Sequence, residues 1–361
     1  MRLIRVSILL LSVLLIVNIG SGSLAGKITV TDLAGRRVEV PIPARRIVAI
    51  GPGALRLVCY VNGVNRVVGI ENIDREGSPG GKTYLIAYPE LKKLPVIGQG
   101  GAFSSPDPEK IVNVKPDVIF ACSFIDRKGA EDLQLKTGIP VVMLDYGIST
   151  IINESLYKSL RLTGMIIGEE KRAGDIVNYI KKTQRELDLR TEKIANEKKP
   201  GVYVGALGMR GGHGIESTQA KYPPFVMVNA RNVADETGRE GSIMIEKEKL
   251  LIWDPDIIFI DLGNYNLVKQ DYHKNPQFYQ ALKAVKNGNV YGQLPFNFYN
   301  TNIDTAIVDA YWAGKVIFPE QFRDIDPVKK ANEIYRFFLG KSLYEELTRT
   351  YGSLTGINIG E

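Results

Sequence analysis

The stretch that decides the fold is Glu109-Lys-Ile-Val-Asn-Val-Lys-Pro-Asp-Val-Ile-Phe120, because it returns 139 residues later as Glu248-Lys-Leu-Leu-Ile-Trp-Asp-Pro-Asp-Ile-Ile-Phe259. Aligned without a gap, the two stretches share Glu, Lys, Pro, Asp, Ile and Phe. Each is typical of a helix end, a Pro that stops the helix, an Asp in the turn and a buried strand. A repeat of this length predicts a duplicated domain and not a solenoid, whose units are roughly 20 to 50 residues. Two lobes enclose a cleft, where small ligands bind.

The pattern outside the repeat predicts an α/β fold, with a mainly parallel sheet flanked by helices in each lobe. After a hairpin at 27–41, the first lobe is expected to contain strands at 46–50, 66–71, 118–121 and 141–144 and a helix at 54–62. The second lobe is expected to contain strands at 202–205, 257–260 and 289–291 and helices near 224–232, 302–316, 327–339 and 342–351. The helical patterns between strands have the length that parallel crossovers require.

A helical stretch from Glu169 to Asn196 belongs to neither lobe. It has no Pro and predicts one rigid helix that crosses between the lobes, about 42 Å long at 1.5 Å per residue. Its apolar stripe does not settle into heptads, so we interpret its charged face as solvated. The expected organisation is a signal peptide at 1–25, an N-terminal lobe at 27–150, an interlobe helix region at 151–198 and a C-terminal lobe at 199–355.

The N-terminus indicates export. Arg2 and Arg5 precede an apolar run from Val6 to Ile19, and small residues follow up to a cleavage-like Ser23-Leu-Ala25. The run is short for a membrane span of roughly 20 residues and fits a signal peptide. An uncleaved N-terminal anchor is the alternative, and it also places the remaining chain outside the cytoplasm, in the periplasm or at the cell surface. No Cys follows the apolar run to carry a lipid.

Composition excludes several classes of protein. Without residues 1–25, 44 basic residues face 40 acidic ones, a net charge of about +4 that is spread along the chain. Nucleic-acid binding needs denser basic stripes interleaved with aromatic residues. Cys59 and Cys122 are the two cysteines; we expect both to be packed thiols, with a disulfide as the alternative in an exported protein.

The sequence motifs give little support for an enzymatic function. The loop Gly51-Pro-Gly53 follows a strand, and Glu71 ends the next strand where a ribose-binding acid of a dinucleotide site belongs. Arg56, however, stands at the third Gly position and Pro52 stiffens the loop. Gly-x-Ser-x-Gly, His-Glu-x-x-His and the phosphate-binding Gly-x-x-x-x-Gly-Lys-Ser/Thr pattern are absent. We therefore expect a binding protein without a cofactor.

Ligands of parallel α/β sheets lie beyond the C-terminal ends of the strands, where the loops converge. The loop 295–302 combines aromatic faces with amide and phenol groups, and its Tyr299 is the candidate for stacking on a ligand. The Gly-rich loop 205–214 offers backbone N–H groups and Arg210 to an anion, and its His213 is a candidate metal ligand or a packed loop residue. The predicted ligand-binding residues are Pro52, Gln99, Phe103, Ser123, Phe124, Arg210, His213, Tyr222, Asn264, Tyr265, Asn297, Tyr299 and Asn302.

The chain resembles the class III substrate-binding proteins of ABC importers. The likeness rests on Ile28-Thr-Val-Thr-Asp-Leu-Ala-Gly-Arg36, on Pro43-Ala-Arg-Arg-Ile-Val-Ala-Ile-Gly-Pro-Gly53, on Arg66-Val-Val-Gly-Ile70 and on both repeats. It covers nearly all of 27–355. The resemblance implies two Rossmann-like lobes joined by one long rigid helix, and a cargo such as a ferric siderophore, haem or cobalamin that is delivered to a membrane permease.

From the resemblance we expect a monomeric binder of an iron(III) chelate or related metal complex, with a corrinoid, haem or an oxyanion such as molybdate as alternatives. In the family, acidic residues on the outer faces of the lobes meet the permease, and here Glu90, Asp235 and Glu236 are the candidates. Arg56 replaces a Glu that the family often has in the first helix. An exported metal chaperone or chelatase and an adhesive surface module are the competing classes, and neither turnover nor a surface role is indicated by a motif.

Overall fold

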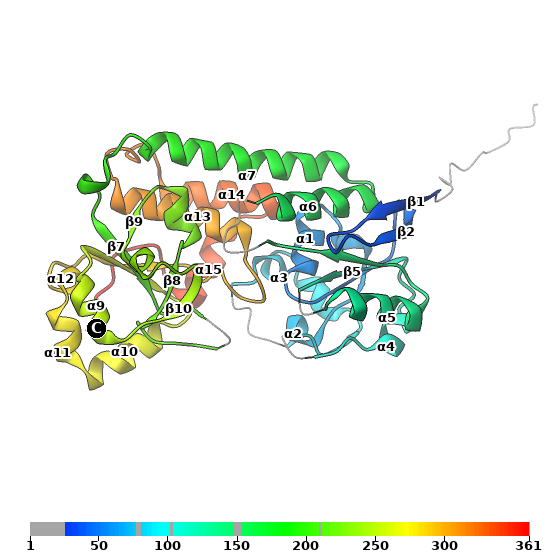
Figure 1. Ribbon diagram of the computed structural model, residues 1–361, viewed down its shortest axis with the longest axis horizontal. Coiled ribbons are helices and arrows are strands. Elements are labelled where there is room, and N and C mark those ends of the chain that lie inside the picture. Colours follow the sequence, from blue (N-terminus) through cyan, green and yellow to red (C-terminus); the bar gives the residue numbers. More distant parts are fainter. Residues whose placement is uncertain are drawn as a thin grey trace, which may run out of the picture.

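The computed structural model describes residues 26–76, 81–101, 104–123, 125–147, 153–208 and 211–360. Two α/β lobes lie side by side, and a layer of helices runs along both of them (Figure 1). The predicted signal peptide at 1–25 lies outside the described residues. Within the described part of the chain, no helix combines the length and the apolar character of a membrane span.

The predicted N-terminal hairpin is confirmed as strands β1 (Gly26–Thr31) and β2 (Arg37–Ile42), which pair antiparallel. The turn between them is closed by Asp32, whose carboxylate accepts hydrogen bonds from the backbone N–H of Arg36 at 2.9 Å and from its guanidinium at 2.7 Å. Both side chains are buried. Arg36 also donates to the carbonyl of Val141. This ion pair therefore docks the hairpin onto the first lobe.

The first lobe is built on a parallel four-stranded sheet in the order β4-β3-β5-β6. All four strands lie where the sequence predicts them, and the apolar runs of β3, β5 and β6 are buried on both faces. The strands are β3 (Ile47–Ile50), β4 (Val67–Gly69), β5 (Val118–Cys122) and β6 (Val141–Leu144). The helices are α1 (Ala54–Tyr60), α2 (Asn72–Arg75), α3 (Thr83–Ala87), α4 (Pro108–Asn113) and α5 (Arg127–Thr137).

The second lobe repeats this topology. Its parallel sheet has the order β12-β11-β7-β9, so in both lobes the first strand lies between the second and the third. The two copies of the sequence repeat form β5 and β11, which occupy equivalent positions. The strands are β7 (Gly201–Gly205), β9 (Arg231–Asn232), β11 (Ile257–Asp261) and β12 (Val290–Gln293). The helices are α8 (Pro223–Met227), α9 (Lys247–Trp253), α10 (Tyr265–Lys274), α11 (Pro276–Ala281), α12 (Lys283–Lys286), α13 (Ile303–Ile317), α14 (Pro327–Leu339) and α15 (Tyr344–Tyr351).

Two parts of the second lobe differ from the prediction. The helix expected near 224–232 is only α8, because Asn229 adopts a left-handed φ of 52° that ends it, and the chain then enters β9. An antiparallel hairpin of β8 (Ser217–Ala220) and β10 (Gly241–Met244) was not predicted. Its two short strands are separated by 20 residues, a spacing that gives no local hairpin signal.

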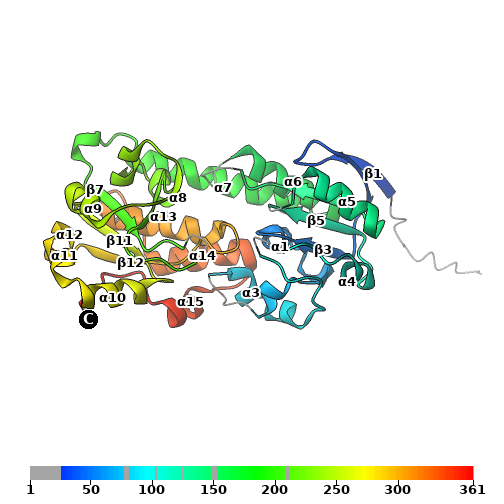
Figure 2. The ribbon, with the colours of Figure 1, turned by 60° about the horizontal axis from the view of Figure 1, so that its bottom comes forward.

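The predicted interlobe helix is α7 (Glu170–Thr191), and it spans both lobes in two views (Figures 1 and 2). It has 22 residues, fewer than the expected 28, because the chain leaves the helix after Thr191 and forms turns up to Lys198. The buried hydroxyl of Thr191 bonds back to the carbonyl of Leu187, a contact that weakens a helix end. Helix α6 (Glu154–Ile167) precedes α7 and packs against it.

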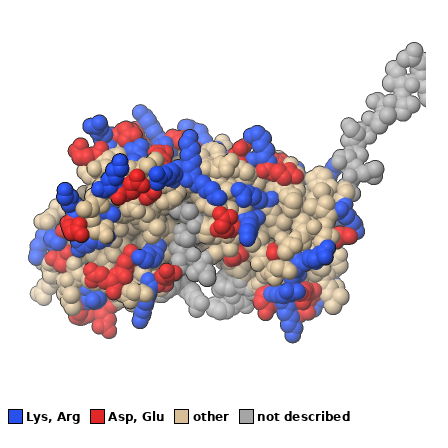
Figure 3. Space-filling view, turned by 45° about the horizontal axis from the view of Figure 1, so that its top comes forward, with Lys and Arg blue, Asp and Glu red and all other residues tan. Residues whose placement is uncertain are grey.

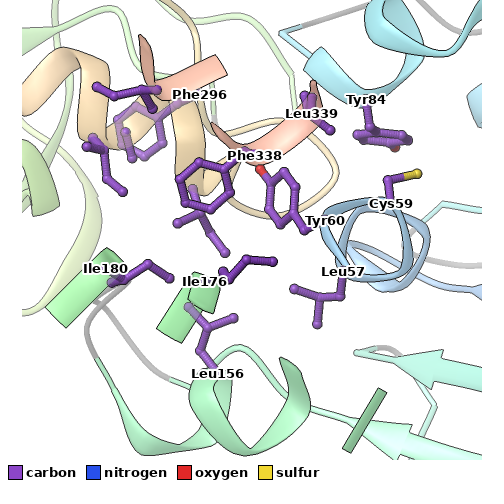
Figure 4. Packing of buried hydrophobic residues seen from close by; sticks show 14 of the residues in the cluster. Leu57, Cys59, Tyr60, Tyr84, Leu156, Ile176, Ile180, Phe296, Phe338 and Leu339 are labelled. Atoms are coloured by element: carbon purple, nitrogen blue, oxygen red, sulfur yellow. The ribbon is translucent and has the colours of Figure 1, made fainter. Parts of the chain in front are cut away.

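Helix α14 strengthens the connection between the lobes. The rings of Tyr179 on α7 and Phe337 on α14 stack with centroids 4.0 Å apart, and Arg172 donates to the carbonyl of Phe338 at 3.1 Å. Figure 4 shows that this layer continues into the first lobe, where Tyr60 of α1 meets Phe338. One hydrophobic core thus joins both lobes through the helical layer.

The outer surface agrees with the charge pattern of the sequence. Lys and Arg side chains are interspersed with Asp and Glu over the face seen in Figure 3. Many of them form exposed pairs such as Arg190 with Asp324 at 2.7 Å. This face has no basic stripe of the kind that nucleic acids need.

Candidate functional site

A pocket between the lobes lies where the strand ends converge. Its cavity has a volume of about 220 Å³. The first lobe contributes the residues that follow β6, and the second lobe contributes the β8/β10 hairpin, the start of α8 and the loop after β12. The lining residues are Tyr146, Gly147, Gln219, Pro223, Gly241, Ser242, Phe296, Asn297, Asn300 and Thr301. We call this cavity the interlobe pocket.

The loop Pro295–Asn302 forms one wall of the pocket, and we call it the wall loop. It folds back on itself, because the backbone N–H and the side-chain amide of Asn302 both donate to the carbonyl of Phe296, at 2.7 and 2.9 Å. Tyr299 and Asn300 at its tip have positive φ values of 52° and 71°. Such values are uncommon for residues other than Gly and persist where surrounding contacts enforce them.

Arg56 of α1 supplies those contacts from the first lobe. Its guanidinium donates to the carbonyls of Phe298 at 3.0 Å and Tyr299 at 3.3 Å, and to the side-chain oxygen of Asn302 at 2.9 Å. It also lies 3.4 Å from the hydroxyl of Tyr146. Arg56 is completely buried. All four of these partners are neutral, so a positive charge is buried behind the pocket wall.

Glu71 holds the tip of the wall loop. Its Oε2 accepts hydrogen bonds from the hydroxyl of Tyr299 at 2.7 Å and from the backbone N–H of Gly51 at 2.9 Å. The same Tyr299 hydroxyl accepts from the N–H of Gly101 at 3.0 Å. Burial raises the pKa of Glu71 to about 7, although the hydrogen bonds from Tyr299 and Gly51 favour the charged form. The pKa of Glu71 is therefore close to neutral pH.

Asn300 completes the contact between the wall loop and the first lobe. Its side-chain amide lies 3.3 Å from the carbonyl of Pro52 and 3.5 Å from the hydroxyl of Ser123. Ser123 follows β5 with a φ of 53°. Of the predicted ligand-binding residues, Asn297 lines the interlobe pocket, and Pro52, Ser123, Tyr299 and Asn302 lie behind it. Tyr299, predicted to stack on the ligand, has its hydroxyl on Glu71 and is not among the lining residues.

The remaining predicted residues lie elsewhere. Tyr222 is fully buried behind the pocket, where its hydroxyl accepts from Gln293 and its ring packs on Phe296. Gln99 is exposed on the segment between α3 and α4. Asn264 donates to the carbonyl of Ala206 at 2.8 Å and Tyr265 to that of Asn358 at 3.0 Å, so both fix the α10 side of the second lobe. Phe103, Phe124 and Arg210 lie outside the described residues.

His213 lines a separate hollow of about 330 Å³ in the second lobe, together with Glu216, Lys247, Asp271 and Lys274. Lys247 and Asp271 are paired there at 2.6 Å. In the described ranges, no group of three His, Cys, Asp or Glu side chains is placed to hold a metal ion.

A larger hollow of about 610 Å³ lies in the first lobe between the segment 104–108 and α5. It is lined by one lobe alone and includes Asp126 and Asp132. We place the candidate site in the smaller interlobe pocket, because both lobes build that pocket at the ends of their parallel strands.

The residues considered for a permease contact are at the surface. Glu90 and Glu236 are exposed, and the partly exposed Asp235 accepts from the N–H of Lys221 at 2.7 Å.

Sequence reasoning missed the part of Arg56 and Glu71 in the site, because both contact the wall loop more than 220 positions away. It missed Gln219 and Ser242 because the β8/β10 hairpin was not predicted.

Comparison with known proteins gives the class of this protein. Residues 47–293, more than half of the chain, match the profile of the periplasmic binding protein family, and the chain belongs to that family. It is a substrate-binding component of an ABC transporter and not an enzyme. The name of the family, and the lipoprotein names of relatives, imply export.

Individual relatives are distant but align with most of the chain. The chain is 22% identical to the molybdate-binding protein MolA of Haemophilus influenzae, over 91% of this chain and 95% of the relative. It is 26% identical to a putative ABC transporter substrate-binding lipoprotein of Bacillus subtilis, YhfQ, over 80% of this chain and 89% of the relative. Among solved structures, the TroA-like periplasmic binding protein FepB of Veillonella parvula aligns with a TM-score of 0.66 and 25% identity, covering 87% of this chain and 97% of that one. MolA bound to molybdate aligns with a TM-score of 0.69 and 20% identity, covering 87% and 98%.

Proposed function

We propose that the interlobe pocket captures a compact anion, a tetrahedral oxyanion such as molybdate or a small anionic metal complex, and that the protein delivers it to the permease of an ABC importer. The observation that carries this proposal is Arg56. Arg56 is completely buried and its four hydrogen-bond partners are neutral, so it places a positive charge behind the pocket wall; the buried Asp304 is an acidic group on which that charge acts. Such a charge stabilises an anion because electrostatic interactions are strong where water is excluded.

The lining of the pocket supports an oxyanion. Gln219 has an amide donor, and Thr301 and Ser242 have hydroxyl donors. Neutral donors can satisfy the oxygens of a tetrahedral anion, while the field of Arg56 balances its charge. The molybdate-binding relative, aligned along nearly the whole of both chains, supports the same chemistry.

The size of the pocket disfavours a bulky chelate. Small-molecule pockets typically have about 300 to 1,000 Å³, and the interlobe pocket has about 220 Å³. The iron(III) chelate expected from the sequence is nevertheless the second candidate. The ring of Phe298, 37% exposed on the wall loop, favours it because a chelate presents apolar ligand surface.

Titration of the mature protein tests the cargo. Molybdate, tungstate, sulfate, phosphate, ferric siderophores, haem and cobalamin are compared by calorimetry and by the fluorescence of Trp253 and Trp312. We expect a tetrahedral oxyanion to bind in the micromolar range or tighter. Saturable binding of a ferric siderophore, haem or cobalamin, with none of any oxyanion, contradicts the proposal. Conversion of the bound compound would instead support the metal-chaperone or chelatase class.

Variants of the lining sharpen this test. Ser242→Ala and Thr301→Val each remove one donor to a charged ligand, a loss of about 1.5 to 3 kcal/mol or roughly 10- to 150-fold in affinity. The matched control is Ser105→Ala in the hollow of the first lobe, which we expect to leave affinity unchanged. Equal affinities of all three variants and the wild type would place the cargo outside the interlobe pocket.

The delivery step has its own test. We infer that Glu90 and Glu236 contact basic residues of the permease from the two lobes, with Asp235 beside Glu236. Charge reversal, Glu90→Lys or Glu236→Lys, is expected to lower cargo uptake by cells while cargo affinity of the purified protein stays the same. Unchanged uptake in both variants would contradict this assignment.

We also expect the purified protein to be a monomer in scattering experiments.

A further inference from the structure

We propose that Glu71 is a positioning residue that anchors the wall loop through Tyr299, and that cargo capture therefore depends on a proton. The role rests on the proposed function in one respect, because it takes the interlobe pocket to be the cargo site. The bond itself joins the two lobes. Glu71 follows β4 of the first lobe, and Tyr299 is at the tip of a loop that leaves β12 of the second lobe.

The contact places Asn300 and Thr301 in the pocket wall. Tyr299 precedes them directly, and its hydroxyl is held at 2.7 Å by Glu71 and at 3.0 Å by the N–H of Gly101. Its φ of 52° is costly for an aromatic residue, and its own hydrogen bond to Glu71 and the one from Arg56 to its carbonyl enforce it together. Release of Tyr299 therefore moves the two pocket residues that follow it.

Arg56 limits the movement to the tip of the loop. It holds the carbonyl of Phe298 and the side chain of Asn302 on either side of Tyr299. Asp304, at the start of α13, is fixed in the first lobe by Thr83 at 2.6 Å and Tyr60 at 2.9 Å. The ends of the wall loop thus stay in place while its tip has two states, anchored and released.

The groups that face Glu71 set the proton dependence. Tyr299 and the N–H of Gly51 donate to it directly, and Asp74 and Lys82 act on it through space with opposite signs. Asp74 and Lys82 are paired with each other at 3.1 Å, and Asp74, which raises the pKa of Glu71, has the larger effect of the two. Burial is the largest influence on the pKa of Glu71, and it disfavours the charged carboxyl, while the hydrogen bond from Tyr299 favours it.

Burial raises the pKa of Glu71 from 4.5 to about 7 in the anchored state. Once the loop tip is released, water reaches the carboxyl and its pKa falls toward the ordinary value. The anchored state consequently binds the proton more tightly. The preference for the anchored state is greatest below about pH 4.5. It decreases as the pH rises toward about 7 and does not change further above that pH.

The first experiment measures the loop without cargo. Hydrogen exchange of the amides in 299–301, corrected for the intrinsic effect of pH, is followed from pH 5.5 to 8. We expect protection to fall as the pH rises in the wild type. Glu71→Gln, which keeps an acceptor and cannot ionise, is expected to stay protected throughout. Tyr299→Phe, which lacks the hydroxyl, is expected to be unprotected throughout.

The control is Glu76→Gln, an exposed carboxyl five positions after Glu71. It is expected to follow the wild type. Asp261 also titrates near neutrality in this protein, but Glu71→Gln leaves it unchanged, so its influence would persist in that variant. A pH dependence shared by the wild type and Glu71→Gln would overturn the proposal, and so would protection of Tyr299→Phe equal to that of the wild type at pH 5.5.

The second experiment measures capture, with micromolar molybdate as the probe. We expect affinity to be about 10- to 30-fold weaker at pH 8 than at pH 5.5 in the wild type and constant in Glu71→Gln. A pH dependence of affinity retained in Glu71→Gln would overturn the link to capture. If loop protection follows pH as expected but molybdate does not bind, the anchor stands and the cargo assignment fails.

Discussion

Asp117 and Asp256 perform the same task 139 positions apart, one in each lobe. The N–H of Asp117 donates to the carbonyl of Arg46 at 2.8 Å, and its carboxylate accepts from the N–H of Arg46 at 2.8 Å. The N–H of Asp256 donates to the carbonyl of Gly201 at 2.8 Å, and its carboxylate accepts from the N–H of Gly201 at 2.7 Å. Each Pro-Asp turn therefore aligns the central strand of its repeat with the neighbouring first strand.

We predict that Asp117→Asn and Asp256→Asn each lower the free energy of unfolding by about 1 kcal/mol, because each weakens a charge-assisted hydrogen bond at a partly exposed strand end. The two losses are expected to add in the double variant, since the sites lie in different lobes. Urea titration gives both values, with Asp132→Asn, an exposed carboxylate on α5, as the control. Single variants as stable as the control would show that the turns do not need the carboxylates.

Arg56 is predicted to be the most sensitive residue of the wall. Arg56→Met leaves the carbonyls of Phe298 and Tyr299 without their donor, and a loss of about 2 to 4 kcal/mol in unfolding free energy is expected. Arg56→Lys keeps the positive charge but loses the planar guanidinium with its several donors. It should therefore keep most of the anion affinity while the free energy of unfolding still falls. Thermal unfolding and anion titration separate the two effects. A stable Arg56→Met protein with full anion affinity would contradict both assignments.

Asp261 gives a prediction about pH and stability. Burial raises the pKa of Asp261 to about 7, and the hydrogen bond from the N–H of Gly263 offsets only part of this shift. Because the folded pKa exceeds the unfolded value, the folded state binds the proton more tightly, and stability falls from mildly acidic pH toward pH 8. We expect Asp261→Asn to flatten this fall in a series of melting temperatures from pH 5 to 8. A wild-type melting temperature that rises from pH 5 to 8 would contradict this prediction.

The two cysteines are predicted to be inert in the folded protein. Both are free and buried, which confirms the expectation of packed thiols. Burial raises the pKa of Cys59 and raises that of Cys122 to about 12, so neither forms the reactive thiolate near neutral pH. A thiol reagent should modify two groups in denaturant and almost none in buffer. Rapid modification in buffer would reveal an opening at α1 or β5.

Local pattern determined much of the architecture. The buried runs of β3, β5, β6, β7 and β11 and the Pro-Asp turns before two of them could be read from the chain, because a parallel strand covered on both faces is apolar without alternation. The C-terminal helices α13 and α14 were also predicted within about one residue of their observed bounds, because their apolar residues follow a helical period. Local pattern did not predict the end of α7, the pairing of β8 with β10 or the strand β9, because contacts with residues far away in the sequence determine them.

The candidate site divides in the same way. The amino-acid sequence alone determined the duplicated α/β lobes, the crossing helix and the importance of the loop 295–302, because these depend on period, turn residues and composition. Only the tertiary structure decided that Arg56 and Glu71 hold that loop, and that Tyr222 and Asn302 are buried behind the pocket and do not line it. The reason is physical: burial, pKa and the hydrogen bonds of a charged side chain depend on neighbours in space, and here those neighbours are on the other lobe.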